Sequence, residues 1–331
     1  MRKRFLTTIA LAGAAALALT ACSNSDSGTK DTSSSGGASG DTLTVGFAQT
    51  GSESGWRSAN TDSMKTAFAA ANGFELVFNA ADNDPAAQII AVRSFINQGV
   101  DAIVIAPIVE DGWDDVLQEA KDAGIPVILE DRTVTSSDDL FAGWVGLDFK
   151  SEGVKAGAWA KKEFGDTPTK MVVLEGTTGS APANDRADGF NEGIDGSAIE
   201  TIDSQTGDFT RDGGKKVMEG FLQKYGVDGI DLVFAHNDDM ALGAIEAIEA
   251  AGAVPGKDIK IVSIDAVHDG MQALSDGKIN YIVECNPLLG DLAAGLVKDV
   301  LAGKTIEKAT YVEDGEFDQA QATAALPDRK Y

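Results

Sequence analysis

The stretch 235–252 reads A-H-N-D-D-M-A-L-G-A-I-E-A-I-E-A-A-G and decides the predicted fold. An apolar run at 232–235 stops at four polar residues, His236, Asn237, Asp238 and Asp239. Beyond them, one residue in four belongs to a regular series, Met240, Ala244, Ile248 and Gly252, and this spacing is typical of one face of a helix. The pattern predicts a buried strand that leads directly into a helix, with Asn237 or Asp238 as its cap and Gly252 at its end. In open parallel sheets, ligands bind at such carboxyl ends of strands.

Strands and helices alternate along the rest of the chain. Besides 232–235, strands are expected at 43–48, 75–79, 102–106, 126–129, 144–147, 170–174, 199–204, 259–264, 281–283 and 309–312. Further helices are expected at 58–71, 85–99, 114–123, 150–164, 183–193, 211–225 and 287–301, and a polar tail follows the last strand. This alternation is typical of parallel sheets covered on both faces. The sequence therefore predicts an α/β fold of two doubly wound, Rossmann-like parallel-sheet lobes that face each other across a cleft.

The amino-terminal residues 1–41 are predicted to lie outside this fold. Arg2, Lys3 and Arg4 precede an apolar stretch at 5–19 that is short for a bilayer span. The next residues, L-T-A-C at 19–22, resemble the lipobox of bacterial lipoproteins, whose cysteine is lipidated; a plain secretory peptide with a chance cysteine is the alternative. The sequence predicts a signal peptide at 1–21, a lipidated Cys22, a disordered Ser/Gly tether at 22–41 and a position at the outer face of the cell membrane.

The chain is long enough for two domains and is strongly acidic. Its 331 residues carry a formal net charge of −25, which becomes −28 when Arg2, Lys3 and Arg4 are removed. Such a surface repels nucleic acid and anionic lipid, so no nucleic-acid partner is expected. No second apolar segment approaches the length of a membrane span, so the lipid alone is expected to attach the protein. With Cys22 lipidated, Cys285 has no intramolecular partner, and the protein is expected to be a monomer without disulfides.

Polar and aromatic side chains follow most of the predicted strands, just past their carboxyl ends. They are Gln49, Glu53, Trp56, Arg57, Asp131, Arg132, Asp185, Arg186, Phe209, Asn237, Asp265 and Glu284. Vicinal sugar hydroxyls accept from a guanidinium group and donate to a carboxylate, while the apolar face of a sugar ring packs on an aromatic ring. The set therefore indicates a sugar site. A phosphate site is disfavoured because no G-x-x-x-x-G-K-[ST] motif occurs and the acids equal or exceed the arginines.

Several of these residues also have a purely structural interpretation. The alternatives are a solvated loop pair for Asp131 and Arg132, a helix cap for Asn237, a surface charge for Arg186, and a core position for Trp56 and Phe209. Trp113 and Trp144 are expected in the core as well. At this point the residues themselves leave both interpretations open.

Neither catalysis nor a metal or other cofactor is predicted. The only two histidines, His236 and His268, follow different strands, which gives a two-histidine metal centre little support. No G-x-S-x-G motif occurs, and the spacing of the carboxylates singles out no pair for glycoside hydrolysis. A binding protein is therefore predicted rather than an enzyme.

Four motifs carry a resemblance to a known family. They are 49–57 (Q-T-G-S-E-S-G-W-R), 91–107 (A-V-R-S-F-I-N-Q-G-V-D-A-I-V-I-A-P), 204–211 (S-Q-T-G-D-F-T-R) and 235–240 (A-H-N-D-D-M). With these motifs the chain resembles the periplasmic galactofuranose-binding proteins of bacterial ABC importers. These are sugar receptors of the ribose-binding type with the type I periplasmic-binding-protein fold. The resemblance runs from about residue 42 to the end of the chain.

The resemblance implies two α/β lobes that are joined by three crossings and close on the sugar. The crossings would fall near Gly146, Cys285 and Lys308. The first lobe would then comprise 42–146 plus 286–308, and the second lobe 147–285 plus 309–331.

The resemblance also implies roles for individual residues. The sugar ring would lie between Trp56 and Phe209, with polar contacts from Asp131 and Arg132 in the first lobe and from Arg186, Asn237 and Asp265 in the second. Capping of the helix after 232–235 would fall to Asp238 or Asp239, which leaves the Asn237 amide free to face the cleft. Glu53 and Glu284 stand where ribose receptors have an asparagine and a glutamine, which favours galactofuranose over ribose.

The leading hypothesis is a lipid-anchored, extracytoplasmic solute-binding protein. It would bind a monosaccharide, galactofuranose or a similar furanose, between its lobes and deliver it to the permease subunits of an ABC importer. The first alternative is a receptor of the same fold that serves a sensor or signalling partner instead of transport. The others are a sugar-responsive transcription regulator, which would carry an N-terminal helix-turn-helix, and a secreted glycosidase.

Overall fold

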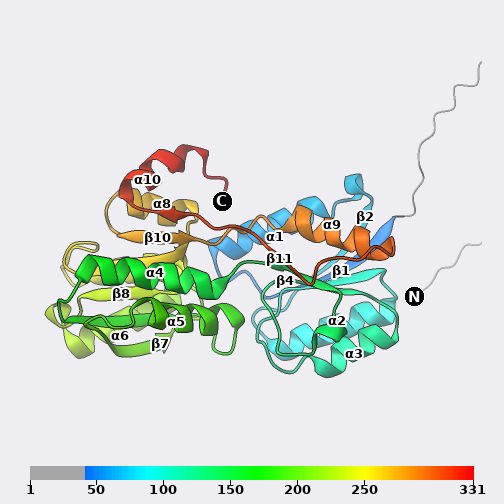
Figure 1. The fold of residues 1–331 in the computed structure, drawn as a ribbon, viewed down its shortest axis with the longest axis horizontal. Coiled ribbons are helices and arrows are strands. Elements are labelled where there is room, and N and C mark those ends of the chain that lie inside the picture. The colour runs from blue at the N-terminus through cyan, green and yellow to red at the C-terminus, as the bar shows by residue number, and fades with distance from the viewer. Residues whose placement is uncertain (1–41) are drawn as a thin grey trace, which may run out of the picture. The chain divides into compact units, whose positions relative to one another are not determined.

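The computed structural model describes residues 42–331 (Figure 1). The predicted signal peptide, the tether and the lipidation site Cys22 lie outside the described residues. Within 42–331 the chain forms two six-stranded sheets, each packed with helices on both faces. This confirms the predicted α/β class with two doubly wound lobes. None of the helices in this range combines the length and the apolar character that a membrane span requires.

The first sheet contains six parallel strands in the order β11-β5-β4-β3-β1-β2. They are β1 (Leu43–Gln49), β2 (Phe74–Ala80), β3 (Ala102–Ile105), β4 (Val127–Asp131), β5 (Gly143–Gly146) and β11 (Ala309–Tyr311). The A-I-V-I run of β3 and the V-I-L-E-D run of β4 are buried throughout, as expected for strands covered on both faces. Neighbouring residues of β3 alternate between these faces, so Ile103 and Val104 belong to different hydrophobic clusters.

Four helices cover this sheet and complete the first lobe. They are α1 (Gly55–Ala67), α2 (Pro85–Gln98), α3 (Asp114–Asp122) and α9 (Gly290–Leu301). Helices α1 and α9 pack on one face, and α2 and α3 on the other. Although α9 lies far from α1 in the sequence, the two helices are side by side (Figure 1). The predicted core positions of Trp113 and Trp144 are confirmed, since both are at most 5% exposed.

The second sheet has the order β12-β10-β9-β8-β6-β7, and only its edge strand β12 is antiparallel to its neighbour. The strands are β6 (Thr169–Glu175), β7 (Ile199–Thr206), β8 (Leu232–Ala235), β9 (Lys260–Asp265), β10 (Tyr281–Glu284) and β12 (Glu316–Phe317). The second lobe is completed by the helices α4 (Phe149–Phe164), α5 (Ala181–Gly193), α6 (Arg211–Tyr225), α7 (Asp238–Ala250), α8 (His268–Ser275) and α10 (Gln319–Ala325). Helices α4 and α5 cover one face of this sheet, and the other four helices cover the opposite face. Short 3₁₀ turns lie at Ala70–Asn72, Asp138–Leu140, Val227–Gly229 and Leu326–Asp328.

The third crossing between the lobes differs from the prediction. The first crossing follows β5, which ends at Gly146, and the second follows β10, which ends just before Cys285. The third was expected near Lys308, but Ala309–Tyr311 still pairs with β5 in the first sheet. The rings of Trp144 and Tyr311 pack edge to face with centroids 5.0 Å apart and hold this strand there. The chain therefore leaves the first lobe only after Tyr311.

The structure also contains elements that the sequence pattern did not predict. Helix α8 was missed, and β12 and α10 occupy part of the predicted polar tail. Helix α10 begins with a capping box, in which Asp318 and Gln321 each bond the other's backbone N–H. Helix α1 begins at Gly55, three residues before the predicted start, so Trp56 and Arg57 belong to its first turn.

Candidate functional site

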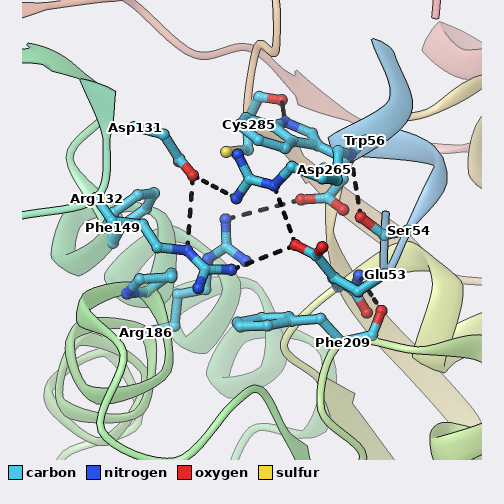
Figure 2. A pocket seen from close by; sticks show the side chains of 13 residues that line it. Glu53, Ser54, Trp56, Asp131, Arg132, Phe149, Arg186, Phe209, Asp265 and Cys285 are labelled. Carbon is cyan, nitrogen blue, oxygen red and sulfur yellow. Dashed lines mark hydrogen bonds and ion pairs between the residues drawn. The ribbon is translucent and has the colours of Figure 1, made fainter. Parts of the chain in front are cut away.

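A cavity with about 280 Å³ of free space lies where the carboxyl ends of both sheets meet (Figure 2). Its wall is formed by Glu53, Ser54, Trp56, Arg57, Asp131, Arg132, Phe149, Pro182, Arg186, Phe209, Asn237, Asp265 and Cys285. Residues from both lobes contribute to this wall.

Nine of the twelve residues predicted at strand ends line the cavity, and Gln49, Asp185 and Glu284 do not. Gln49 is fully buried behind the β1–α1 turn, where its Nε2 donates to Asn60 Oδ1 at 3.0 Å. Glu284 accepts from the Tyr331 hydroxyl at 2.8 Å and from the Gly315 N–H at 2.9 Å. Gln49 thus fixes a turn, and Glu284 joins the second crossing to the segment that follows the third.

The amino terminus of α1 lies at the cavity. The Ser54 hydroxyl caps this helix by accepting from the Arg57 N–H at 3.1 Å. Trp56 Nε1 donates to the Cys285 carbonyl oxygen at 2.6 Å, which fixes the indole ring against the second crossing. The Ser54 cap and the indole hydrogen bond therefore direct two successive helix residues, Trp56 and Arg57, to the cavity.

Arg57 is buried and bridges two carboxylates. Its Nε donates to Glu53 Oε1 at 3.0 Å, and its Nη2 donates to Asp131 Oδ2 at 2.6 Å. Burial alone would lower the pKa of Arg57, but the charges of Asp131 and Glu53 outweigh it and raise the pKa. Burial alone would likewise raise the pKa of Glu53, yet Arg57 and Arg132 hold that pKa below its ordinary value. Arg57 and Glu53 therefore stay ionised beside each other.

Arg132 lies farther from its carboxylate partners than Arg57 does. Its Nη1 donates to the Ile108 carbonyl at 3.2 Å, whereas its Nη2 lies 3.5 Å from Glu53 and its Nε 3.6 Å from Asp131. Burial and the neighbouring charge of Arg57 lower the pKa of Arg132 to about 10. Although Nε is buried, it donates no hydrogen bond to any residue in 42–331. A buried donor of this kind is normally satisfied, and an acceptor on a ligand would satisfy it.

Arg186 and Asp265 form the charged part of the second lobe's wall. Arg186, on α5, donates through Nε to Glu152 Oε2 and through Nη1 to the His236 carbonyl, both at 2.7 Å. Its Nη2 lies 3.7 Å from Asp265 Oδ1, which is too far for a hydrogen bond. Burial raises the pKa of Asp265 well above its ordinary value, although Arg186 opposes this shift. Both groups keep hydrogen-bonding capacity for a ligand.

Phe209 is positioned by contacts on several sides. The Asn237 Nδ2 donates to its carbonyl oxygen at 3.0 Å. Its ring packs directly on Gly176, where a Cβ would lie 1.9 Å from ring atom Cζ. The guanidinium carbons of Arg132 and Arg186 lie 5.3 and 5.9 Å from the ring centroid. The Phe209 ring therefore lies close to one arginine of each lobe.

The cap of α7 is Asn237, and the expectation that Asp238 or Asp239 would cap it is wrong. Asn237 Oδ1 accepts the third backbone N–H of the helix at 3.0 Å. Asp238 instead accepts from the Val267 N–H at 2.9 Å, and Asp239 from the Gly55 N–H at 2.7 Å. Both polar atoms of Asn237 have partners within the protein, so its amide is not free, contrary to the expectation. The residue does line the cavity.

Three cavity residues have a backbone that L-residues rarely adopt. The φ angle is 61° at Asp131, 61° at Phe209 and 128° at Asp265. Such conformations cost about 1–3 kcal/mol each and are common where a protein holds a ligand. Asp131 and Asp265 are the last residues of β4 and β9, so the strain arises where the strands turn into the cavity wall.

Direct hydrogen bonds also join the two lobes. The Gly55 N–H of the first lobe donates to Asp239 of the second at 2.7 Å. The Glu110 N–H donates to the Gly179 carbonyl at 3.0 Å, and the Glu110 carboxylate accepts from Asn184 Nδ2 at 2.6 Å. The structure is therefore in a closed arrangement, in which the lobes contact each other beside the cavity.

A buried acid behind the cavity predicts that the stability of the protein falls as pH rises to about 8. Burial and the charge of Asp131 raise the pKa of Glu130 from 4.5 to about 8. Between these two values the unfolded chain releases the Glu130 proton while the folded protein still holds it, so the stability falls as pH rises and is lost once pH passes the folded value. We expect the melting temperature to fall between pH 5 and 8, and to fall less in Glu130→Gln, by at least about 2 °C. Thermal melts across this pH range check the difference, and equal slopes would contradict it.

Four wall residues were not predicted: Ser54, Phe149, Pro182 and Cys285. Ser54 and Phe149 could have been found, since Ser54 is a capping residue three positions before Arg57 and Phe149 follows β5 as an aromatic past a strand end. Pro182 and Cys285 carry no such signal. Across residues 42–331, no group of three or more His, Cys, Asp or Glu side chains is arranged to hold a metal ion.

The cavity wall contains arginines and acidic residues in equal number. Three arginines, Arg57, Arg132 and Arg186, face three carboxylates, Glu53, Asp131 and Asp265. A phosphate would meet the three carboxylates as repelling neighbours, whereas an uncharged ligand with several hydroxyl groups finds both donors and acceptors. The wall is therefore suited to bind a small neutral polyhydroxy compound.

Comparison with known proteins identifies one sequence family that spans most of the fold. The family described as "Periplasmic binding protein domain" matches residues 45–305. The galactofuranose-binding protein YtfQ of Escherichia coli (strain K12) is 46% identical over 293 residues, which cover 86% of this chain and 88% of that protein.

Two solved structures resemble this one closely. A Mycobacterium smegmatis protein in complex with β-D-fucofuranose is 56% identical, with a TM-score of 0.84 over 87% of this chain and 95% of its own. The periplasmic binding protein of the arabinose ABC transporter from Shewanella sp. ANA-3, bound to α- and β-L-arabinofuranose, is 44% identical. Its TM-score is 0.83, and the match covers 87% of this chain and 96% of that one.

Proposed function

Because the chain belongs to the periplasmic binding protein domain family, whose members are solute-binding proteins and not enzymes, we propose that it binds a monosaccharide for an ABC importer. The sugar occupies the cavity between the lobes in its furanose form, as galactofuranose or a similar furanose. The protein is held at the outer face of the cell membrane by a lipid on Cys22 and delivers the sugar to the permease subunits.

The observation that carries this proposal is the set of unused hydrogen-bonding groups in the cavity wall. Within 42–331, Arg132 Nε has no acceptor, and Asp265 lies 3.7 Å from Arg186, its nearest cationic partner. A sugar hydroxyl is both donor and acceptor, so adjacent hydroxyls can satisfy a guanidinium and a carboxylate together. Trp56 and Phe209 in the same wall offer apolar contact to the C–H groups of the ring.

The choice of a furanose is supported by relatives. The Mycobacterium smegmatis and Shewanella structures contain furanoses as ligands, and the Escherichia coli relative is a galactofuranose-binding protein.

The mechanism is binding coupled to closure. A ligand that contacts both lobes favours the closed state, because its free energy of binding is largest there. The first lobe supplies Arg57 and Arg132, and the second supplies Arg186 and Asp265, so one sugar contacts both lobes in the closed state. The permease then recognises the closed arrangement, and no covalent step is involved.

A thermal-shift screen tests this function. The purified protein is melted with L-arabinose, D-fucose, D-galactose and D-ribose, each of which equilibrates between pyranose and furanose forms, and any co-purified ligand is identified by mass spectrometry. We expect at least one of the first three sugars to raise the melting temperature, since a ligand at 100 times its Kd stabilises by about 2.7 kcal/mol. No shift with any sugar and no co-purified sugar would refute the proposal.

Gly176→Ala is expected to weaken sugar binding although residue 176 does not line the cavity. The new Cβ would overlap the Phe209 ring, which must then shift toward the sugar. Overpacking of this kind costs about 1–3 kcal/mol, which corresponds to roughly 5-fold or more in Kd when the cost falls on the sugar-bound state. Gly220→Ala on α6 is the matched control, because a Cβ there meets nothing within 4 Å. Calorimetric titration checks both variants, and equal affinities would contradict the expected role of Gly176.

A further inference from the structure

Glu152 lies directly behind Arg186 and does not line the cavity. It belongs to the first turn of α4 and is completely buried. Its Oε2 accepts from Arg186 Nε at 2.7 Å, and the nearby Cys285 thiol, which lines the cavity, opposes together with Arg186 the rise in pKa that burial causes. A buried ion pair by itself adds little to stability, because the desolvation of its charges offsets their attraction. The pairing of Glu152 with Arg186 is therefore better explained by a role at the cavity than by stabilising the fold.

The packing of α4 on α5 fixes the distance between Glu152 and Arg186. The two helices approach backbone to backbone at glycines. A Cβ on Gly153 would lie 2.4 Å from the Arg186 carbonyl oxygen, and one on Gly189 would lie 2.1 Å from the Lys150 carbonyl oxygen. Because these contacts leave no room for sliding, the carboxylate is held at one place beside the guanidinium group.

The contacts of Arg186 leave one edge of its guanidinium group unoccupied. Nε donates to Glu152, and Nη1 donates to the His236 carbonyl at 2.7 Å. These two acceptors determine both the plane of the group and its rotation within that plane. Nη2 then points to the cavity side, 3.7 Å from Asp265 Oδ1, where a ligand hydroxyl can accept from it.

We propose that Glu152 is a positioning residue for the ligand: it orients the Arg186 guanidinium group so that Nη2 is presented to a sugar hydroxyl. This role rests on the proposed sugar-binding function. Glu152 then contributes to the affinity for the sugar although it lies outside the cavity wall. The alternative is a purely structural role, in which Glu152 only helps to hold α4 against α5.

A set of substitutions distinguishes the two roles. Glu152→Met removes the acceptor at similar volume and is expected to raise the Kd for the sugar about 10-fold or more. Glu152→Gln keeps an oxygen acceptor for Arg186 Nε, so affinity within about 3-fold of the parent is expected. Should Glu152→Met fail to fold, Glu152→Asp replaces it, because the shorter side chain keeps the charge but cannot reach Nε without moving the guanidinium group.

The decisive measurement is a double-mutant cycle with Arg186→Lys, followed by calorimetric titration with L-arabinose or whichever of the four sugars the parent binds. If Glu152 acts through Arg186, Glu152→Met adds less than about 2-fold to the Kd of Arg186→Lys. An equal loss in both backgrounds, or no loss in the parent background, would overturn the positioning role. A parent protein that binds none of the sugars would instead refute the proposed function, and the positioning role with it.

Discussion

Arg132→Ala is expected to lower the affinity for the sugar at least about 100-fold. Charge-assisted hydrogen bonds contribute about 1.5–3 kcal/mol each, and the guanidinium group has its buried Nε and part of Nη2 available for ligand hydroxyls. Loss of two such bonds corresponds to a factor of about 100 or more. The melting temperature of the ligand-free protein should change little, because Arg57 remains to neutralise Glu53 and Asp131.

Isothermal titration of Arg132→Ala and of Arg93→Ala checks this expectation. Arg93 is a fitting control because its side chain is 44% exposed and pairs only with Glu119, away from the cavity. We expect Arg93→Ala to bind like the parent. An Arg132→Ala variant that keeps parental affinity would remove this arginine from the ligand site.

Asp265→Ala is the second substitution with a large expected effect. Its carboxylate is buried, faces the cavity and lies 3.7 Å from Arg186, so it is available to accept hydroxyl hydrogens from a sugar. Removing a charged acceptor from a buried ligand contact costs about 2–5 kcal/mol, which corresponds to at least about 30-fold in Kd.

Whereas the affinity for the sugar falls, the melting temperature of ligand-free Asp265→Ala should rise or stay unchanged. Burial and the negative charges of Asp238 and Glu152 raise the pKa of Asp265, so the ionised carboxylate destabilises the ligand-free protein near neutral pH. Asp269→Ala, at a carboxylate that is 64% exposed, serves as the control and should leave both properties unchanged. A large drop in the melting temperature of Asp265→Ala would show that the carboxylate supports the fold instead of the ligand.

The location of the site could be predicted because the topology determines it. In a parallel sheet all carboxyl ends lie on one edge, and two such sheets that face each other across a cleft bring residues such as Asp131 and Asp265 together. The structure places both residues in the wall of the same cavity. Most residues of this wall were thus predictable as a group.

The individual hydrogen-bond partners could not be predicted in the same way. Asn237, Asp238 and Asp239 are all good helix caps, and the choice among them depends on distant donors. The N–H groups of Val267 and Gly55 bind the two carboxylates, which leaves capping to the amide. No pattern in the local sequence contains those partners.

The contacts of the carboxyl-terminal segment could not be predicted from the local sequence either. Glu284 was expected at the ligand because it follows a strand, but it contacts Tyr331 and Arg329 from the far end of the chain. Strand β12 has two residues, which is too short for any alternation to be seen. Only the capping box of α10, with Asp318 and Gln321, was readable in advance.

In the proposed function, one furanose sugar binds between the lobes without being converted. Isothermal titration of the purified protein with L-arabinose, D-fucose and D-galactose, followed by analysis of the recovered sugar, tests it most directly. We expect one site per chain for at least one sugar, a Kd of about 1 μM, equivalent to about −8 kcal/mol, and sugar recovered unchanged. No binding of any of the three, or a sugar recovered as a different product, would contradict the account.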